Sequence, residues 1–596
     1  MLTIIPKPQR MGKGKGALSL CFANLHLFAP KTESGRLTKK LRREFPDAAL
    51  TLHECEEYYL SLSAENPLAA GLDKNAVKDK YDGYLLSAKG GDLTVYAPTA
   101  RGLFYGIVTL CRIKNEARTE LYIEDYADVK NRFGYFDLRM LHPKHECLLS
   151  YIEEMASYKA NGLIIEYEDK LPFTRYPFLS HKDFAMTAEQ HAELLSVAAD
   201  NYVEIIPLQQ CFGHLEYVLK HPVFRQLREC EDSLGELCPS KEESFALVCN
   251  LLEEMMEKHP ESRYIHVGCD EVWTLCSCEV CHAAYGEDKE GCFIDFVNRI
   301  VDFVCAHGKI PIVWHDMLEH CSEENSARMD KRAAVMLWLY AAKLSEEQVT
   351  SLYKKFSTYG MTVMGACAVC NNGGRDDQNY PLADNRLNNV DAWVAPLAHT
   401  SIDTIVSTNW SASFGMACPY GIYETSLYTL YYSFEKYWNK TADRETYLTR
   451  FLTDFHGIDT SLPEMAELLR GRRAPDYYYA IGSLSEYCTK HKSIAQWIGV
   501  SRRYEQVKCH FPPHLYAYRY RFYGNEEGEV ASLRSKILAF REQLAPIRAQ
   551  MESLLSEFMS EGMAELFLAS RFFFHDFLEE HLYGEVVAKQ FPEQSE

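Results

Sequence analysis

Two adjacent carboxyl groups, Asp270 and Glu271, are the residues of this sequence best placed to do acid–base chemistry. They end the predicted strand Tyr264–Glu271, a short apolar run with the β-branched residues typical of a buried strand. Two carboxyl groups held close together cannot both ionise freely, so one pKa tends to rise while the other stays low. The protonated group can then donate a proton, and the ionised group can stabilise a developing cation.

The geometry of a strand sets a condition on this chemistry. Side chains alternate along a strand, so His266, Gly268 and Asp270 share one face while Glu271 points to the other. Both carboxylates can serve one pocket only if the strand stops there and the chain turns out of the pleat. The alternative interpretation is a buried strand whose Asp and Glu cap the helix that follows.

The surrounding chain repeats a strand–helix alternation from about residue 130. Candidate strands, each apolar and ending in polar or aromatic residues, are Phe133–Met140, Gly162–Glu168, Glu204–Gln209, Tyr264–Glu271, Ile310–Met317, Ala333–Tyr340, Met361–Val369 and Thr404–Trp410. Amphipathic stretches between them are Leu148–Lys159, Thr187–Asn201, Glu242–Lys258, Cys292–His307 and Leu344–Tyr359. The count of strands predicts an α/β fold with a closed (β/α)8 TIM barrel.

Charged, amide and aromatic residues collect at the predicted strand ends, where the working residues of such barrels cluster. They are Arg139, Glu166, Glu168, Asp169, Gln209, His214, Asp270, Glu271, Trp314, Asp316, Trp338, Tyr340, Cys370, Asn371, Asn372, Asn409 and Trp410. This concentration favours an enzyme with a sugar-sized pocket. Taken singly, an Arg at a strand end can serve a structural ion pair, and a Trp can serve the core.

The flanking regions predict two further domains. Residues 1–125 have the pattern of a small α/β domain, with strands Tyr84–Ser87 and Leu93–Ala97 around a turn at 89–92 and a helix at Ala100–Leu110. Residues 126–430 form the predicted barrel. Residues 431–596 have a helical pattern, with Tyr431–Asn439, Arg444–His456, Leu462–Leu469, Asp476–Thr489, Val530–Glu557 and Phe567–Tyr583 as candidate helices.

Composition narrows the class of protein and its partners. The 596 residues carry 63 basic and 84 acidic side chains, a formal charge of −21, which argues against nucleic acid and anionic membrane surfaces as partners. No apolar run is long enough to span a membrane, and the N-terminus lacks the pattern of a signal peptide. Twenty cysteines without an export signal favour reduced thiols. We therefore expect a cytoplasmic protein.

With these strand ends in order, the sequence resembles glycoside hydrolase family 20, the β-N-acetylhexosaminidases, and is most similar to the intracellular branch typified by hexosaminidase D. The segment His266–Glu271 is similar to the family's His-x-Gly-x-Asp-Glu signature. Further matches are Asp137–Arg139, Ala160–Asp169, Phe212–Glu216, Trp314–Met317 and Trp410. The resemblance covers the barrel well and the first domain more weakly.

The resemblance implies a substrate-assisted reaction, in which the nucleophile is the 2-acetamido oxygen of the substrate itself. It assigns Asp270 to orienting that group and stabilising an oxazolinium intermediate, and Glu271 to general acid and base catalysis. Arg139 would bind sugar hydroxyls, Trp314, Trp338 and Trp410 would wall the sugar, and Tyr340 would bind the acetamido oxygen. The side chains of His214, His266 and Glu166 would support or contact the substrate. No cofactor is implied, and the expected partner is an N-acetylhexosamine-containing glycan.

One departure from the family pattern concerns the far end of the sugar. Many members place a Glu just after the Trp of the last strand, whereas Trp410 is followed here by Ser411, Ala412 and Ser413. Glu424 and Asp316 are the candidates to replace it.

A second departure is the motif Cys276-Ser277-Cys278-Glu279-Val280-Cys281-His282. Its spacing suits a structural zinc with Cys292 or His282 as the fourth ligand, although the chemistry needs no metal. The sequence leaves this open, together with the preference for GlcNAc or GalNAc, the aglycone and the oligomeric state.

Two other functions remain as alternatives. The first is a non-catalytic glycan-binding protein on a barrel that has lost activity; the second is a metal-dependent hydrolase using His214, His266 and Asp270.

Overall fold

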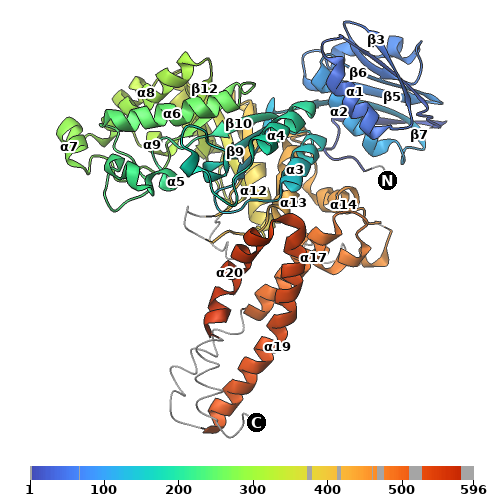
Figure 1. Cartoon of the computed structure of the whole chain (residues 1–596). Coiled ribbons are helices and arrows are strands. Elements are labelled where there is room, and N and C mark those ends of the chain that lie inside the picture. Colours follow the sequence, from blue (N-terminus) through green and yellow to red (C-terminus); the bar gives the residue numbers. More distant parts are fainter. Residues whose placement is uncertain are drawn as a thin grey trace.

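The structure is a computed structural model of the whole chain that describes residues 3–65, 67–371, 379–412, 418–459, 461–465, 476–508 and 527–578. Figure 1 shows an N-terminal sheet domain in blue, a barrel in green to yellow and C-terminal helices in orange to red. The predicted fold class, a (β/α)8 barrel with a small α/β domain and a helical region, is confirmed.

The barrel closes through eight parallel strands. They are β8 (Asn131–Asp137), β9 (Gly162–Glu166), β10 (Glu204–Leu208), β11 (Tyr264–Gly268), β12 (Ile310–Trp314), β13 (Ala334–Trp338), β14 (Thr362–Cys370) and β15 (Thr404–Asn409). The ring closes where β15 pairs with β8 in the register Thr404↔Asn131 to Asn409↔Phe136. All predicted strands are present, and seven of them end one to three residues earlier than predicted. The polar residues at their ends leave the ladder and enter the loops.

The barrel interior is filled by side chains and is not a pore. Its buried apolar layers comprise Phe133, Tyr135, Ile164, Ile206, Leu208, Ile312, Trp314, Ala334, Met336, Met364, Ala366 and Val406. These residues lie beneath the loops at the C-terminal strand ends and form a rigid floor for them.

Helices on the outside of the barrel cover the strands. They are α3 (His145–Ser157), α4 (Ala188–Asp200), α6 (Glu242–Lys258), α8 (Lys289–Ala306), α11 (Glu346–Thr358), α12 (Ala383–Val394) and α13 (Leu427–Trp438). The starts of α4 and α11 are fixed by capping boxes, Thr187 with Gln190 and Ser345 with Gln348, which pair backbone N–H groups that the helix leaves free. The sequence did not predict α12.

The N-terminal domain is a seven-stranded sheet in the order β1-β7-β5-β6-β4-β2-β3. Its strands are β1 (Arg10–Ala17), β2 (Asn24–Ala29), β3 (Ala49–Glu54), β4 (Tyr58–Ser61), β5 (Tyr81–Lys89), β6 (Asp92–Ala97) and β7 (Thr119–Ala127), with helices α1 (Ser34–Glu44) and α2 (Ala100–Ile113). The predicted hairpin β5–β6 and the predicted helix α2 are both present.

The C-terminal region is helical, and its last two long helices run side by side (Figure 1). Its helices after α13 include α14 (Arg444–Asp454), α16 (Tyr477–Leu484), α17 (Lys492–Lys508), α19 (Glu527–Phe558) and α20 (Glu561–Leu578). The sequence did not predict α17. The second half of the predicted helix Leu462–Leu469 and the last part of Phe567–Tyr583 lie outside the described residues.

Within the described segments, no helix combines the length and the apolar character needed to cross a membrane.

Candidate active site

The chain turns out of the pleat directly after β11, as two neighbouring carboxylates in one pocket require. β11 ends at Gly268, and the φ angles of Gly268, Cys269 and Glu271 are +66°, +69° and +48°. This left-handed backbone is strained for Cys269 and Glu271. A side chain at Gly268 would be strained, because φ is positive there and a Cβ would lie 1.8 Å from Gln210 Oε1, so that Gln210 would have to move. The turn brings Asp270 and Glu271 to the same cavity.

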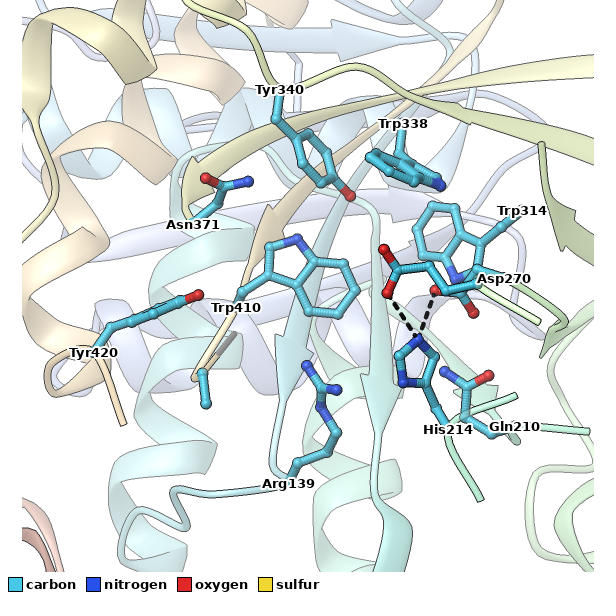
Figure 2. Close-up of a pocket in the computed structure, with 12 residues that line it drawn as sticks. Arg139, Gln210, His214, Asp270, Trp314, Trp338, Tyr340, Asn371, Trp410 and Tyr420 are labelled. Carbon is cyan, nitrogen blue, oxygen red and sulfur yellow. Dashed lines mark ion pairs between the residues drawn. The ribbon is translucent and has the colours of Figure 1, made fainter. Parts of the chain in front are cut away.

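His214, in the loop after β10, lies between the two carboxylates. Its Nε2 is 3.4 Å from Asp270 Oδ2 and 3.4 Å from Glu271 Oε2 (Figure 2). Burial alone would lower the pKa of His214, but the Asp270 charge and the bonds to both carboxylates raise it to about 11. His214 is therefore an imidazolium at neutral pH and holds the two acids together.

The two acids have different surroundings. Burial alone would raise the pKa of Asp270, but the neighbouring His214 charge holds it below its usual value. Its Oδ1 is buried and has no hydrogen-bond partner in the described part of the chain. The Glu271 side chain is 35% exposed, against 12% for Asp270, so Glu271 lies nearer the mouth.

Asp316 holds the backbone of Glu271 and the indole of Trp338. Its Oδ2 accepts a hydrogen bond from the Glu271 backbone N–H at 2.9 Å, and its Oδ1 accepts one from Trp338 Nε1 at 3.1 Å. Burial and the Asp270 charge raise the pKa of Asp316 to about 7. Because both oxygens are used and Asp316 is not among the described residues lining the cavity, it holds Glu271 and Trp338 in place.

The cavity has a volume of about 220 Å³, smaller than the roughly 300–1,000 Å³ of clefts that bury drug-sized ligands. Figure 2 shows three indole rings and Tyr340 around it, with Arg139 on the opposite side. Its lining comprises Arg139, Gln210, His214, Asp270, Glu271, Trp314, Trp338, Tyr340, Asn371, Trp410, Ala412 and Tyr420. Such a space suits one small polar ligand with apolar faces.

The aromatic wall is continuous. Ring centroids are 6.3 Å apart for Trp314 and Trp410, 5.4 Å for Trp338 and Tyr340, and 6.4 Å for Tyr340 and Trp410. Trp314 Nε1 and the Tyr340 hydroxyl are buried without a hydrogen-bond partner in the described chain. With Asp270 Oδ1 they leave two donors and one acceptor unused beside the cavity, which is rare for buried polar groups.

Arg139 combines the two roles considered for it. Its guanidinium bonds both Asp137 oxygens at 2.9 Å and lies 3.7 Å from Glu166 Oε2, so the structural ion pair exists. It also lines the cavity and stacks over Trp410, 5.4 Å from the ring centroid. The ion pair fixes a cation at the wall of the pocket.

Glu166 and His266 support the lining. Glu166 accepts hydrogen bonds from Tyr135 and, at 2.9 Å, from Gln210 Nε2; burial raises its pKa. His266 is fully buried, its ring lies 4.4 Å from that of Trp314, and its Nδ1 accepts from the Gly268 N–H at 3.0 Å. Burial lowers the pKa of His266 to about 3, so it is a neutral packing partner of Trp314.

The structure places Glu424 away from the position suggested for it. Glu424 is buried, its carboxylate accepts a hydrogen bond from Tyr151, and it is not among the described residues lining the cavity. Burial raises its pKa to about 7. At the strand end after Trp410, Ser411 instead gives its N–H to Asp137 at 3.0 Å.

Sequence reasoning noted Asn371 at a strand end without giving it a role, and it did not single out three further lining residues, Gln210, Ala412 and Tyr420. Gln210 lies two residues after the end of β10, and Asn371 lies one residue after the end of β14. Their polar side chains at a strand end were therefore a signal that sequence reasoning could use. Tyr420 had no such signal. Arg571 of α20 bonds the Pro419 and Tyr420 carbonyls, so the C-terminal helices position this part of the wall.

The metal-hydrolase alternative finds no support here. Among the described residues, the group of side chains arranged as possible metal ligands is Glu229, Cys238, Cys278 and Cys281, outside this cavity. His266 packs against Trp314 with its ring tilted and does not belong to this group of possible metal ligands.

Comparison with known proteins places the chain in one family. Residues 139–359 match the family model described as "Glycosyl hydrolase family 20, catalytic domain", and residues 1–126 match "Glycosyl hydrolase family 20, domain 2". The catalytic match contains the strands from β9 to β13, with Asp270 and Glu271.

Two curated relatives are named Hexosaminidase D. The protein from Bos taurus is 31% identical over 307 residues, which are 49% of this chain and 88% of that protein. The Homo sapiens protein is 31% identical over 289 residues, 47% of this chain and 60% of that protein.

Solved structures share the fold at low identity. The β-N-acetylhexosaminidase from Bacteroides fragilis NCTC 9343 superposes with a TM-score of 0.58 and 18% identity, covering 76% of this chain and 94% of that one. The family 20 exo β-N-acetylglucosaminidase from Vibrio harveyi, solved with N-acetylglucosamine, gives 0.57 and 16%, covering 75% of each chain.

Proposed function

The chain belongs to glycosyl hydrolase family 20, and we propose that it is an exo-acting β-N-acetylhexosaminidase that removes terminal, non-reducing β-linked GlcNAc or GalNAc. The small cavity with an aromatic wall supports this, because aromatic faces pack well on the C–H-rich faces of one sugar ring. The substrate is an N-acetylhexosamine-containing glycan or glycoconjugate. The cytoplasmic location stays a prediction.

The mechanism that we propose is substrate-assisted. The acetamido oxygen of the sugar attacks its own anomeric carbon, the bond to the leaving oxygen breaks, and Glu271 gives that oxygen its proton. Asp270 orients the acetamido N–H and stabilises the positive charge of the oxazolinium intermediate. Glu271 then takes a proton from water, which attacks the anomeric carbon and restores the acetamide with retained configuration.

One observation carries this proposal: Asp270 and Glu271 both lie 3.4 Å from the same nitrogen of His214. An enzyme nucleophile and a separate acid flank the anomeric carbon from opposite sides, about 5–5.5 Å apart in retaining enzymes. Asp270 and Glu271 are adjacent in the chain, and their carboxylates share one imidazolium. That arrangement suits an acid and a group that holds the acetamide next to it.

The neighbouring residues have matching roles in the proposal. The His214 imidazolium lies beside Glu271 and stabilises the carboxylate that Glu271 becomes after protonating the leaving group, until Glu271 takes a proton from water. The Tyr340 hydroxyl and Trp314 Nε1 have no partner of their own in the described chain, and the hydroxyl is the donor for the acetamido oxygen. Arg139 and Asn371 bind hydroxyls at the far end of the sugar, where Glu424 is not available.

Substrate choice tests the proposal. We expect rapid release of the aryl group from β-N-acetylglucosaminides or β-N-acetylgalactosaminides, with a β-configured first product by NMR. The matching β-glucoside, which lacks the acetamide, should not be cleaved. Cleavage of the glucoside at a similar rate, or a trapped covalent sugar–protein adduct, would contradict the mechanism. Sugar binding without turnover across the panel would favour the glycan-binding alternative.

A further inference from the structure

A cluster of thiols lies beside the active site and takes no part in the proposed reaction. Cys278 Sγ and Cys281 Sγ lie 3.4 Å and 3.3 Å from Cys238 Sγ. One carboxylate oxygen of Glu229 lies with these three sulfurs, all four atoms being within 4.8 Å of one another. Cys238, Cys281 and Glu229 are buried, and Cys278 is half-buried.

We propose that these four residues bind a structural zinc ion that ties together the two loops carrying the catalytic residues. The donor set, three thiolates and one carboxylate, is one that Zn²⁺ accepts in four-coordinate sites. A tetrahedral zinc about 2.3 Å from each sulfur separates two sulfurs by about 3.8 Å, within about half an ångström of the observed spacings. A disulfide would require about 2.05 Å, and the described cysteines are free.

Glu229 gives a second, independent indication of a cation. Its Oε1 accepts a hydrogen bond from the Cys278 N–H at 3.0 Å, whereas its Oε2 is buried with no hydrogen-bond partner in the described chain. Glu229 is only 3% exposed, and a buried carboxylate that faces thiols and lacks a cation is costly. A zinc ion would supply positive charge beside the Glu229 carboxylate and would be bound by the three thiolates. Its binding releases the protons of the thiols.

The local backbone supports ligation by the Cys278–Cys281 pair. Cys278 is the N-cap of α7 (Glu279–Tyr285), and its Sγ accepts a hydrogen bond from the Cys281 N–H at 3.3 Å. The Ser240 hydroxyl lies 3.1 Å from Cys281 Sγ. Hydrogen bonds of this kind orient thiolate ligands of a metal.

The set differs from the one suggested by spacing alone. Cys278 and Cys281 remain, but Cys238 and Glu229 come from the loop after β10, 40 and 49 residues before Cys278. Cys276 and Cys292 contact each other, and Cys292 contacts Cys281, so they surround the site. The His282 side chain is 59% exposed and faces Glu287.

The position of the cluster connects it to catalysis. Leu237 N–H bonds Phe212 O at 3.4 Å, and Leu215 N–H bonds Gly235 O at 2.9 Å, so the segment before Cys238 lies against the segment carrying His214. On the other loop, the N–H groups of Trp273 and Thr274 bond Glu236 at 3.0 Å and 2.8 Å. A zinc ion would add a further link between the two loops and fix the distance from His214 to Asp270 and Glu271.

Metal content is the direct test, and it does not depend on activity. Elemental analysis of the full chain purified under reducing conditions should find about one zinc per chain. After replacement by Co²⁺, the protein should show thiolate-to-cobalt charge-transfer absorption. Cys238→Ser and Cys281→Ser should lose the zinc and melt at a lower temperature. Cys249→Ser and Cys305→Ser change half-buried cysteines outside the group and should keep it.

The fourth ligand has its own test. Glu229→Gln should release zinc to a competing chelator at least about tenfold more readily, and Cys292→Ser should not. The reverse result would overturn the assignment of Glu229. Wild-type protein without zinc after incubation with Zn²⁺, zinc retained by both ligand variants, or a Cys238–Cys281 disulfide in the reduced protein would overturn the site. If the serine variants do not fold, the wild type can be treated with a chelator and its reactive thiols counted. We expect three newly reactive thiols, and no increase in reactive thiols would contradict the proposal.

Discussion

The two ends of the barrel each contain a buried carboxylate, a cation, a tyrosine and a tryptophan, yet they use them differently. At the end facing the N-terminal sheet, Asp125 Oδ2 accepts from Lys159 Nζ at 2.8 Å and from the Tyr84 hydroxyl at 2.5 Å. Its Oδ1 accepts from Trp438 Nε1 at 2.8 Å. Every member of this group bonds another member.

At the opposite end, the corresponding group is Asp270, His214, Tyr340 and Trp314. Only the contact between His214 and Asp270 is made; Tyr340, Trp314 Nε1 and Asp270 Oδ1 have no partner in the described chain. The same residue types therefore stabilise the protein at one end and stay available to a ligand at the other. Unmade hydrogen bonds of buried groups, and not residue type, distinguish the active site from the domain interface.

The largest expected effect is on catalysis, at Glu271. Glu271→Gln should lower kcat for aryl N-acetyl-β-hexosaminides by about 10²–10⁴-fold, because the leaving oxygen loses its proton donor. The loss should be much smaller with a leaving group that needs no protonation. Asp270→Asn should lower kcat by about 10²–10³-fold for every leaving group, since it acts on the oxazolinium charge. Equal losses with both classes of leaving group in Glu271→Gln would contradict its role as the acid.

The next effect concerns stability, at the interface. Asp125→Asn leaves Lys159 buried beside a neutral group, and we expect the free energy of unfolding to fall by about 3–5 kcal/mol. Denaturant titration measures this change. Because the network lies away from the cavity, kcat at low temperature should stay within about twofold, which is about 0.4 kcal/mol. A large loss of kcat without loss of stability would remove the contrast between the two ends.

A matched pair of tyrosines sharpens the comparison. Tyr84→Phe removes a hydroxyl bonded to Asp125 and Thr109 and should destabilise the protein by about 1–3 kcal/mol. Tyr340→Phe removes a hydroxyl that makes no close hydrogen bond within the described residues, although the Thr408 and Trp410 side chains lie near it, so the free energy of unfolding should stay within about 0.5 kcal/mol. Its kcat/KM should fall about tenfold, the loss of one ligand hydrogen bond. Thermal unfolding and steady-state kinetics of both variants provide the test, and equal destabilisation would contradict it.

The last expected effect is a pH dependence of stability due to His214, which is gradual because it is spread over several pH units. Its pKa is raised from 6.5 to about 11 in the folded protein, so its stabilisation is complete below pH of about 6.5 and is lost as pH rises toward 11. We therefore expect the difference in unfolding free energy between wild type and His214→Gln to shrink between pH of about 6 and about 10, by up to about 1.4 kcal/mol per unit. A difference that grows with pH would mean that His214 is neutral.

The strand ends show how much of the site the sequence predicted. Short apolar runs that alternate with amphipathic stretches predicted all eight barrel strands. Asp270, Glu271, Trp314, Trp338, Tyr340 and Trp410 line one cavity because parallel strands end at one face of the barrel. The sequence could not predict that Glu424 lies away from the cavity, because Glu424 is buried against Tyr151, a residue far away in the sequence. Tyr420 was missed because α20 holds its loop.

The amino-acid order alone determined the barrel strands, most of the helices that cover them, the acid pair at one strand end and the family signature, because these depend on local periodicity and adjacent residues. Only the tertiary structure decided which groups share a space. It placed His214 between the acids, used both oxygens of Asp316 for positioning, and brought Cys238 and Glu229 to Cys278 and Cys281. The physical reason is that contacts between loops depend on chain closure and packing, which no local pattern encodes.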